Sequence, residues 1–161
     1  MEGNTLVRYP VVPPNFNSEN IQKKDWSGTD IRRESQGKHK DPTSIQYRMI
    51  QDLIQTKLFS IVFDDDGAGE VADIVCIADD HDKLEIELYH CKYAHGDAPG
   101  SRVADLYEVC CQAEKSIKWC SAPQSMIERL IKREVDRNRE GLSRIDFGSL
   151  QKLREIKNNA K

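Results

Sequence analysis

Residues 64–95 decide the fold of this chain, and their sequence is DDDGAGEVADIVCIADDHDKLEIELYHCKYAH. The segment begins with acidic residues and two glycines, which are typical of a turn. Two apolar runs follow, separated by a short polar stretch, and this pattern predicts a β-hairpin. The hairpin carries a carboxylate, Asp73, on one strand and a lysine, Lys92, at the end of the other. Because charges at the edge of an apolar sheet are costly to bury, their presence there indicates a functional site.

The composition is that of one folded domain. The chain has 161 residues, of which 38% are apolar and 32% are charged, so it can bury a core and keep a polar surface. No apolar run is long enough to span a bilayer, and the N-terminus lacks the pattern of a signal peptide. The five cysteines include an adjacent pair, and their apolar neighbours favour reduced thiols over disulfides. We therefore expect a soluble, cytoplasmic protein that does not bind membranes.

Helices are predicted on both sides of the hairpin. Residues 43–57 begin with a serine and a threonine that can cap a helix, and apolar residues follow at helical spacing. Residues 102–119 carry a second apolar face, which we expect to pack on the core; its members are Val103, Leu106, Cys110, Ala113 and Ile117. Two further helices are predicted, over residues 123–139, which begin with a proline, and over residues 147–156.

The order of the elements predicts an α/β protein. Strands are expected over residues 58–63, 71–78 and 83–92. A helix, three strands and then helices indicate a small mixed sheet with helices packed on it.

The expected domain comprises residues 43–161, with a core over 43–120 and C-terminal helices over 123–157. Residues 1–42 lack periodicity and predict an irregular extension, a solvated arm or linker. The basic residues of this arm could also contact phosphates.

The register of the hairpin determines which side chains meet. Side chains alternate between the two faces of a strand. The register that we favour pairs Ala78 with Lys83 and places Asp73 opposite Leu88, on the face of Lys92. It keeps the apolar faces of both strands together. A hairpin loop one residue longer or shorter would turn Asp73 to the other face of the sheet.

Two short motifs lie between the predicted helices, GEVADIV at residues 69–75 and HCKY at residues 90–93. This arrangement resembles the PD-(D/E)XK nucleases, the restriction-endonuclease-like superfamily, and especially its Mrr-like branch. The resemblance covers residues 43–120. It implies a restriction-endonuclease-like α/β/α sandwich with a small mixed central sheet flanked by helices.

The resemblance also implies roles for individual residues. Asp73 would be the main metal ligand, and the backbone carbonyl of Cys91 a further one. Lys92 would orient the attacking water and offset charge on the scissile phosphate. The implied cofactor is Mg²⁺ or Mn²⁺, since hard oxygen ligands suit Mg²⁺ and a bound water can become the nucleophile.

The function implied is that of a metal-dependent endonuclease domain that hydrolyses DNA in restriction, defence or repair, often fused to or working with a helicase or other ATPase. The net charge of −3 argues against a protein that coats nucleic acid, but a bound cation can offset the carboxylates of a nuclease. The alternative is a catalytically silent domain of the same fold that binds nucleic acid or a partner protein.

Two positions depart from the family pattern. Ala72 stands where the family name has proline, and His90 stands where an acid is expected. Histidine suits Mn²⁺ and other transition metals better than Mg²⁺; alternatively it bonds a metal-bound water or a phosphate, or marks a lost site. The missing carboxylate has three candidate sources, which are Glu70, the acidic loop 64–66, and the first helix with Gln46, Gln51 and Asp52.

Two other interpretations stay open. Asp73 and Lys92 could form a structural ion pair that does no chemistry. His90, Cys91 and His95 could bind zinc, although neighbouring residues of a strand point to opposite faces and no CxxC motif is present.

Overall fold

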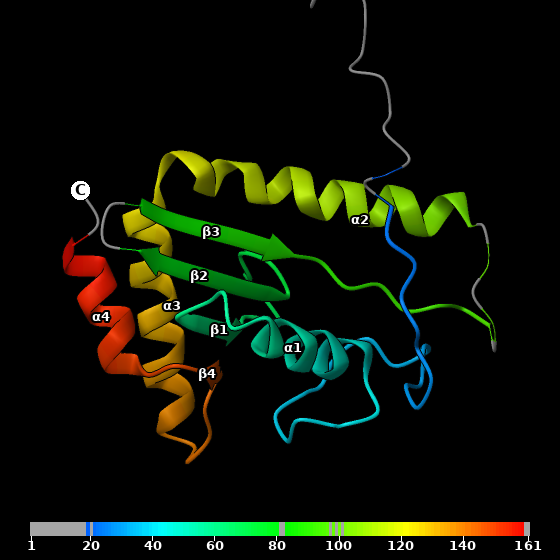
Figure 1. Ribbon diagram of the computed structural model, residues 1–161, viewed down its shortest axis with the longest axis horizontal. Coiled ribbons are helices and arrows are strands. Elements are labelled where there is room, and N and C mark those ends of the chain that lie inside the picture. Colours follow the sequence, from blue (N-terminus) through cyan, green and yellow to red (C-terminus); the bar gives the residue numbers. More distant parts are fainter. Residues whose placement is uncertain are drawn as a thin grey trace, which may run out of the picture.

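The computed structural model describes residue 19 and residues 21–80, 83–96, 98, 100 and 102–159. Within this part of the chain, four strands form one sheet in the order β3-β2-β1-β4, and helices lie around it (Figure 1). The strands are β1 (Ile61–Asp64), β2 (Ile74–Asp80), β3 (Lys83–Tyr89) and β4 (Ile145–Phe147). The structure is thus of the α/β class, as predicted.

The sheet differs from the prediction in two respects. Every pair of neighbouring strands is antiparallel in the described part of the chain, so the expected mixed sheet is wrong. The fourth strand, β4, was not predicted because three residues are too few to show a period. It follows a helix and enters the sheet beside β1 in the opposite direction.

The helices are α1 (Ile45–Thr56), α2 (Val103–Ser116), the 3₁₀ helix η2 (Ile117–Ser121), α3 (Pro123–Asn138) and α4 (Leu150–Asn159). Ser44 caps α1, because its hydroxyl accepts a hydrogen bond of 3.1 Å from the backbone N–H of Tyr47. Pro123 occupies the first turn of α3, as predicted. The last helix starts three residues later than predicted, since Phe147 belongs to β4. None of the helices in the described ranges is both long and apolar enough to cross a lipid bilayer.

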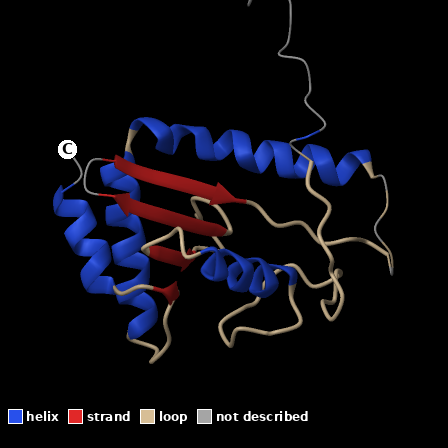
Figure 2. Cartoon of the chain, viewed as in Figure 1, coloured by secondary structure: helices blue, strands red, loops and turns tan. Residues whose placement is uncertain are grey.

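Helices cover both faces of the sheet (Figure 2). On one face, α1 packs on β1 and β2 through a cluster that includes Ile50, Leu53 and Val62. On the other face, α3 and α4 pack on the same strands, and the cluster comprises Ile61, Phe63, Val71, Val75, Ile77, Met126, Ile127, Leu130, Leu153 and Ile156. Residues on both faces of β2 are fully buried, which explains its continuous apolar sequence.

Each side chain of the hairpin lies on the predicted face of the sheet, but the residues that lie opposite one another differ from the prediction. Val75 lies opposite Leu88, so the apolar faces of β2 and β3 are together. Ala78 lies opposite Glu85 rather than Lys83, a shift of two residues that leaves every side chain on its expected face. The strand β2 continues to residue 80, and residues 81 and 82 lie outside the described residues.

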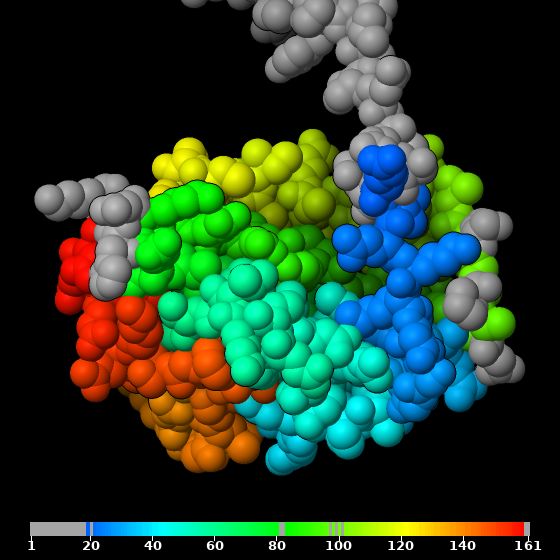
Figure 3. Space-filling view, in the orientation of Figure 1, coloured from blue at the N-terminus to red at the C-terminus, as the bar shows by residue number. Residues whose placement is uncertain are grey.

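Residues 21–42 contain no helix or strand, yet they pack against the domain (Figure 3). Gln36 is buried. The backbone N–H of Ala94 donates to the carbonyl of Ile31, and that of Asp30 donates to the carbonyl of Thr43, both at 2.7 Å. This part of the predicted arm therefore belongs to the folded domain. Residues 1–18 and residue 20 of that arm lie outside the described residues.

The apolar face of α2 does not pack on the core as predicted. Val103, Leu106 and Ile117 are 63%, 62% and 64% exposed. The side of α2 that contacts the protein is polar instead, and its contacts are made by Asp105, Glu108 and Ser116. Periodicity identified an amphipathic helix but could not show which face is covered.

Two leucines on helices test this placement of α2. Leu130→Ala, in the buried cluster under α3, should lower the free energy of unfolding by about 2–5 kcal/mol because it leaves a cavity. Leu106→Ala, at an exposed position, should change it by no more than about 0.5 kcal/mol. Urea unfolding of both variants measures the difference. Similar losses in the two variants would contradict an exposed α2 face.

Candidate metal centre

The β2–β3 ladder opens at one end, and the candidate site lies there. At this end, β2 begins three residues later than predicted and β3 ends three residues earlier, and side-chain hydrogen bonds replace backbone ones. The N–H of Cys91 donates to Asp73 Oδ2 at 2.7 Å, and the N–H of Val71 donates to Asp65 Oδ2 at 2.6 Å. Asp73 is thereby held in the gap between the two strands, with only 4% of the residue exposed.

Three predicted site residues come together in this gap. One ligand atom from each of Glu70, Asp73 and His90 lies within 4.8 Å of the others. Asp73 Oδ2 and His90 Nδ1 are 3.4 Å apart, and the two side chains are 6% and 7% exposed. Of the three candidate sources for the second carboxylate, Glu70 is the residue found here.

The cluster fits a divalent cation. A metal–ligand bond of about 2.1 Å allows two ligands to be at most about 4.2 Å apart, so a small side-chain adjustment would bring the three atoms onto one ion. His90 Nδ1 is buried and has no hydrogen-bond partner within the described residues. Buried polar atoms without a partner are rare and costly, and a cation at this point would satisfy the nitrogen.

The charges around Asp73 also favour a cation. Burial raises the pKa of Asp73 to about 7, against the hydrogen bond from Cys91, and the negative charges of Glu70, Asp66 and Glu34 raise it further. Burial also lowers the pKa of His90. The site thus holds an excess of carboxylates and a neutral imidazole, which bind a positive ion well.

The loop before Glu70 is held by arginines of the C-terminal half of the chain. Arg133 donates to the carbonyls of Asp65 and Ala68, at 2.7 and 2.9 Å, and pairs with the buried Asp65 carboxylate. Arg129 donates to the carbonyl of Gly69. Gly69 has a φ of 76°, and a Cβ there would lie 2.5 Å from the Arg129 guanidinium. The loop therefore needs glycine at this position, and its clamped backbone directs Glu70 to the site.

The other candidate carboxylates have structural partners. Asp64 accepts from the side chains of Gln36 and Gln46, at 2.9 and 3.0 Å. Gln46 also donates to the backbone carbonyl of Asp73, at 3.0 Å. From the first helix, Asp52 pairs with Lys24 and Arg48, and Gln51 is half-buried. Gln46 thus supports the backbone of Asp73, and none of the side chains named here belongs to the metal-like group found in the described residues.

Lys92 contacts two glutamates rather than Asp73. In the described part of the chain, its Nζ lies 2.7 Å from Glu108 Oε1 and 3.4 Å from Glu34 Oε2. The alternative interpretation, a structural ion pair between Asp73 and Lys92, is therefore not supported, because Lys92 pairs with Glu108 and Glu34. Glu34 also accepts from the N–H of Tyr93, at 2.9 Å. Glu34 was missed because it lies in a segment without periodicity, where no pattern predicts a neighbour.

Cys91 faces Asp73 with its backbone N–H, and a metal bond to its carbonyl stays a prediction. Its side chain is buried in the cluster under α1. His95 pairs with Asp105, at 3.3 Å. In the described ranges, the metal-like group consists of Glu70, Asp73 and His90, so the structure does not support the zinc interpretation.

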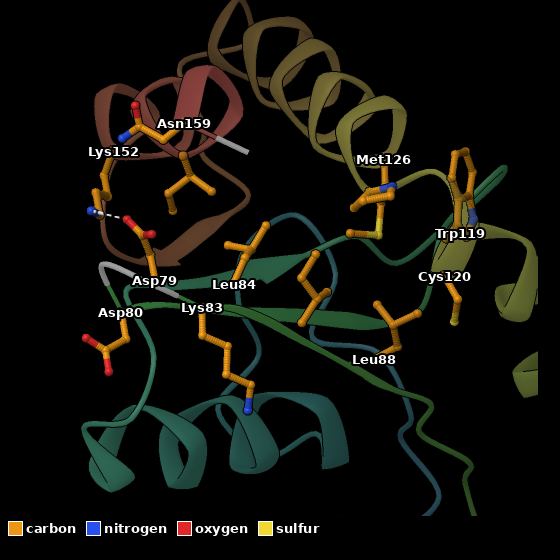
Figure 4. Close-up of a pocket in the computed structure, with 13 residues that line it drawn as sticks. Asp79, Asp80, Lys83, Leu84, Leu88, Trp119, Cys120, Met126, Lys152 and Asn159 are labelled. Atoms are coloured by element: carbon orange, nitrogen blue, oxygen red, sulfur yellow. Dashed lines mark hydrogen bonds and ion pairs between the residues drawn. The ribbon is translucent and has the colours of Figure 1, made fainter. Parts of the chain in front are cut away.

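A cavity of about 820 Å³ lies along β3 beside the cluster, and none of the three cluster residues lines it. Leu84 and Leu88 form part of its wall, Trp119 lies at one end, and the Asp79–Lys152 ion pair of 2.7 Å lies at the other (Figure 4). The cavity combines apolar side chains along β3 with charged ones, among them Asp79, Asp80, Lys83 and Lys152. Because none of the three cluster residues lines it, the candidate metal site is assigned from the ligand chemistry of the cluster and not from cavity size.

Comparisons with protein-family models, with curated proteins and with solved structures find no match for this chain.

The raised pKa of Asp73 makes a pH-dependent prediction for the metal-free protein. Its pKa is 3.8 ordinarily and about 7 in the folded state, so the folded protein holds a proton that the unfolded chain has lost. Folding is then weakened as pH rises from about 4 to about 7, by up to about 1.4 kcal/mol per pH unit. Asp73→Asn removes this pH-dependent loss of stability, so the free energy of unfolding of the variant should rise relative to that of wild type as pH increases over this range.

Urea unfolding in the presence of a chelator measures this difference at several pH values. Asp80→Asn is the matched control, because Asp80 is exposed at the end of the same strand. A difference between Asp73→Asn and wild type that does not vary with pH would show that the buried carboxylate keeps an ordinary pKa.

The arginine clamp gives a second stability prediction. Arg133→Met leaves the Asp65 carboxylate buried without its cation and should lower the free energy of unfolding by about 3–5 kcal/mol. Adding Asp65→Asn should recover part of the loss, because the amide oxygen can still accept from Val71. Arg139→Met, at an exposed ion pair, should cost no more than about 1 kcal/mol. Equal, small effects of Arg133→Met and Arg139→Met in urea unfolding would contradict the clamp.

Proposed function

We propose that this chain is a metal-dependent phosphodiesterase domain of the PD-(D/E)XK superfamily that hydrolyses DNA in restriction, defence or repair. The observation that carries the proposal is the cluster of Glu70, Asp73 and His90, whose ligand atoms lie within 4.8 Å of one another. It lies at the open end of a hairpin, and a lysine follows two residues after His90. We take this arrangement as a variant of the family pattern, with His90 in place of the expected acid and Glu70 as the second carboxylate.

The chemistry divides between the cluster and Lys92. A bound Mg²⁺ or Mn²⁺ would supply Lewis acidity and a water of lowered pKa. Glu70, Asp73 and His90 would hold the ion in a largely buried site. Lys92 would contact the scissile phosphate and offset its charge.

To contact the scissile phosphate, Lys92 must give up one of its two glutamate partners. Its Nζ contacts Glu108, whose side chain is 53% exposed. The Lys92 side chain is 13% exposed, so Glu108 is the solvent-facing partner of the pair and the one that a phosphate could replace. Glu34, at 3.4 Å, would keep the ammonium in place.

A small cavity beside Lys92 supports a nucleic-acid substrate. Its volume is about 250 Å³, and its lining includes Lys92 and Arg102 as cations and Trp26, Tyr93 and His95 as aromatic rings. Aromatic rings stack on bases and cations contact phosphates, and together they are typical of sites for nucleic-acid strands. Its carboxylate, Asp105, is paired with His95, which limits its repulsion of phosphate.

The ion pairs of Lys92 favour a second candidate, a catalytically silent domain of the same fold that binds nucleic acid or a partner protein. In that case Glu34 and Glu108 hold Lys92 permanently. The two candidates differ in metal uptake and in cleavage.

A cleavage assay tests the proposal. The purified protein is incubated with supercoiled plasmid, linear duplex and single-stranded DNA, in Mg²⁺ or in Mn²⁺. We expect cleavage that needs the metal, and a loss of about 10²–10³-fold in rate for Asp73→Ala, Glu70→Gln and Lys92→Ala, because each removes a group that binds the metal or the phosphate.

Matched controls come from the exposed face of β3. Lys83→Ala and Glu85→Gln change a lysine and a glutamate whose side chains are 72% and 52% exposed, and they should cleave like wild type. Cleavage that persists in Asp73→Ala and Lys92→Ala would overturn the assignment. DNA binding without cleavage and without metal uptake would support the silent domain.

A further inference from the structure

The two ring nitrogens of His90 face different groups. Nε2 lies 2.9 Å from Ser116 Oγ. Nδ1 lies 3.4 Å from Asp73 Oδ2 and has no hydrogen-bond partner within the described residues. The side chain is 7% exposed, so bulk water does not satisfy this nitrogen. An unpartnered, buried nitrogen is therefore directed at a carboxylate.

Ser116 determines which nitrogen carries the hydrogen. Its hydroxyl oxygen lies 2.6 Å from the carbonyl oxygen of Val71 and 3.2 Å from that of Gln112. Carbonyls only accept, so the single hydroxyl hydrogen points to one of them and away from His90. The contact with His90 then requires that its Nε2–H donates to Ser116. In the neutral ring this leaves the lone pair on Nδ1.

We propose that Ser116 is a positioning residue that fixes this tautomer of His90, and that the resulting site selects a first-row transition-metal ion over Mg²⁺. The inference rests on the proposed function in taking Glu70, Asp73 and His90 as the ligands. Two carboxylates and an imidazole nitrogen suit Mn²⁺, Fe²⁺, Co²⁺ or Zn²⁺, whereas Mg²⁺ prefers oxygen ligands. Outer partners of this kind hold a ligating imidazole in orientation and tautomer.

Ser116 also links the polar side of α2 to the candidate site. The serine is the last residue of that helix and is buried, and it joins the helix to His90 and to the carbonyl of Val71. Gln112, one turn before Ser116, is also half-buried. The helix thus reaches the ligands through Ser116 while its apolar side faces outward.

A histidine–aspartate pair without a metal is the competing arrangement. There the hydrogen lies on Nδ1 and is donated to Asp73, so that no cation is needed between the two side chains. The two arrangements differ in the place of one hydrogen. An experiment on the metal-free protein can therefore distinguish the two arrangements.

Nitrogen NMR of the imidazole rings in the metal-free protein makes this distinction, with His90→Gln to assign the signals. We expect hydrogen on Nε2 of His90 in wild type. Ser116→Ala should give a mixture of tautomers, and Ser116→Thr, which keeps a hydroxyl, should restore the single form. Hydrogen on Nδ1 in wild type, or an unchanged tautomer in Ser116→Ala, would overturn the proposal.

Calorimetry with Mn²⁺ and with Mg²⁺ tests the selectivity. Wild type should bind Mn²⁺ at least about tenfold more tightly than Mg²⁺, and Ser116→Ala should weaken Mn²⁺ binding by about 10–100-fold with little change for Mg²⁺. Ser121→Ala, an exposed serine in the next turn, is the matched control. Electron paramagnetic resonance should show nitrogen coupling to bound Mn²⁺, and this coupling should vanish in His90→Gln. Equal affinities for both ions in wild type would contradict the inference.

The outcomes separate this inference from the proposed function. Nitrogen-coupled Mn²⁺ binding without DNA cleavage would leave the inference standing and overturn the nuclease. Cleavage supported equally by Mg²⁺ and Mn²⁺, in wild type and in Ser116→Ala alike, would leave the nuclease standing and overturn the inference.

Discussion

The burial of the Asp73 carboxylate at the open end of the β2–β3 hairpin is the constraint on which the site depends. The residue is 4% exposed, and the backbone N–H of Cys91 donates to its carboxylate at 2.7 Å. The charges of Glu70, Asp66 and Glu34 add to the cost of ionising it. Such a carboxylate requires a proton or a cation. A divalent cation stabilises all the surrounding carboxylates at once, and this favours a metal over a proton.

The surrounding structure holds this carboxylate from several directions. Arg129 and Arg133, both on α3, bind the loop that leads to Glu70. Gln46, on α1, donates to the backbone carbonyl of Asp73. Ser116, on α2, contacts the imidazole that faces it. Because these contacts come from three different helices, the candidate site depends on the packing of the sheet and all three helices, and the domain acts as one scaffold for it.

Local patterns in the sequence predicted the hairpin and its parity, since alternating side chains and an apolar face on each strand permit only one parity. They placed Asp73 in the hairpin, although it lies one residue before β2 and not opposite Leu88, and they named Glu70 among its possible partners. The exposed side of α2, with Leu106, could not be predicted, because periodicity does not show what covers a face. No sequence pattern identified Glu34 or Ser116 as part of the site either. Glu34 lies in an irregular segment, and Ser116 is a single hydroxyl residue in a helix. Each becomes part of the site only through tertiary contacts.

The claim that Glu70, Asp73 and His90 form one metal site is tested most directly by anomalous scattering from crystals of the protein grown with Mn²⁺. We expect one strong peak about 2.2 Å from an oxygen of each carboxylate and from Nδ1 of the imidazole. At a saturating Mn²⁺ concentration, the absence of a peak between these three side chains, or a peak only at other residues, would contradict the claim.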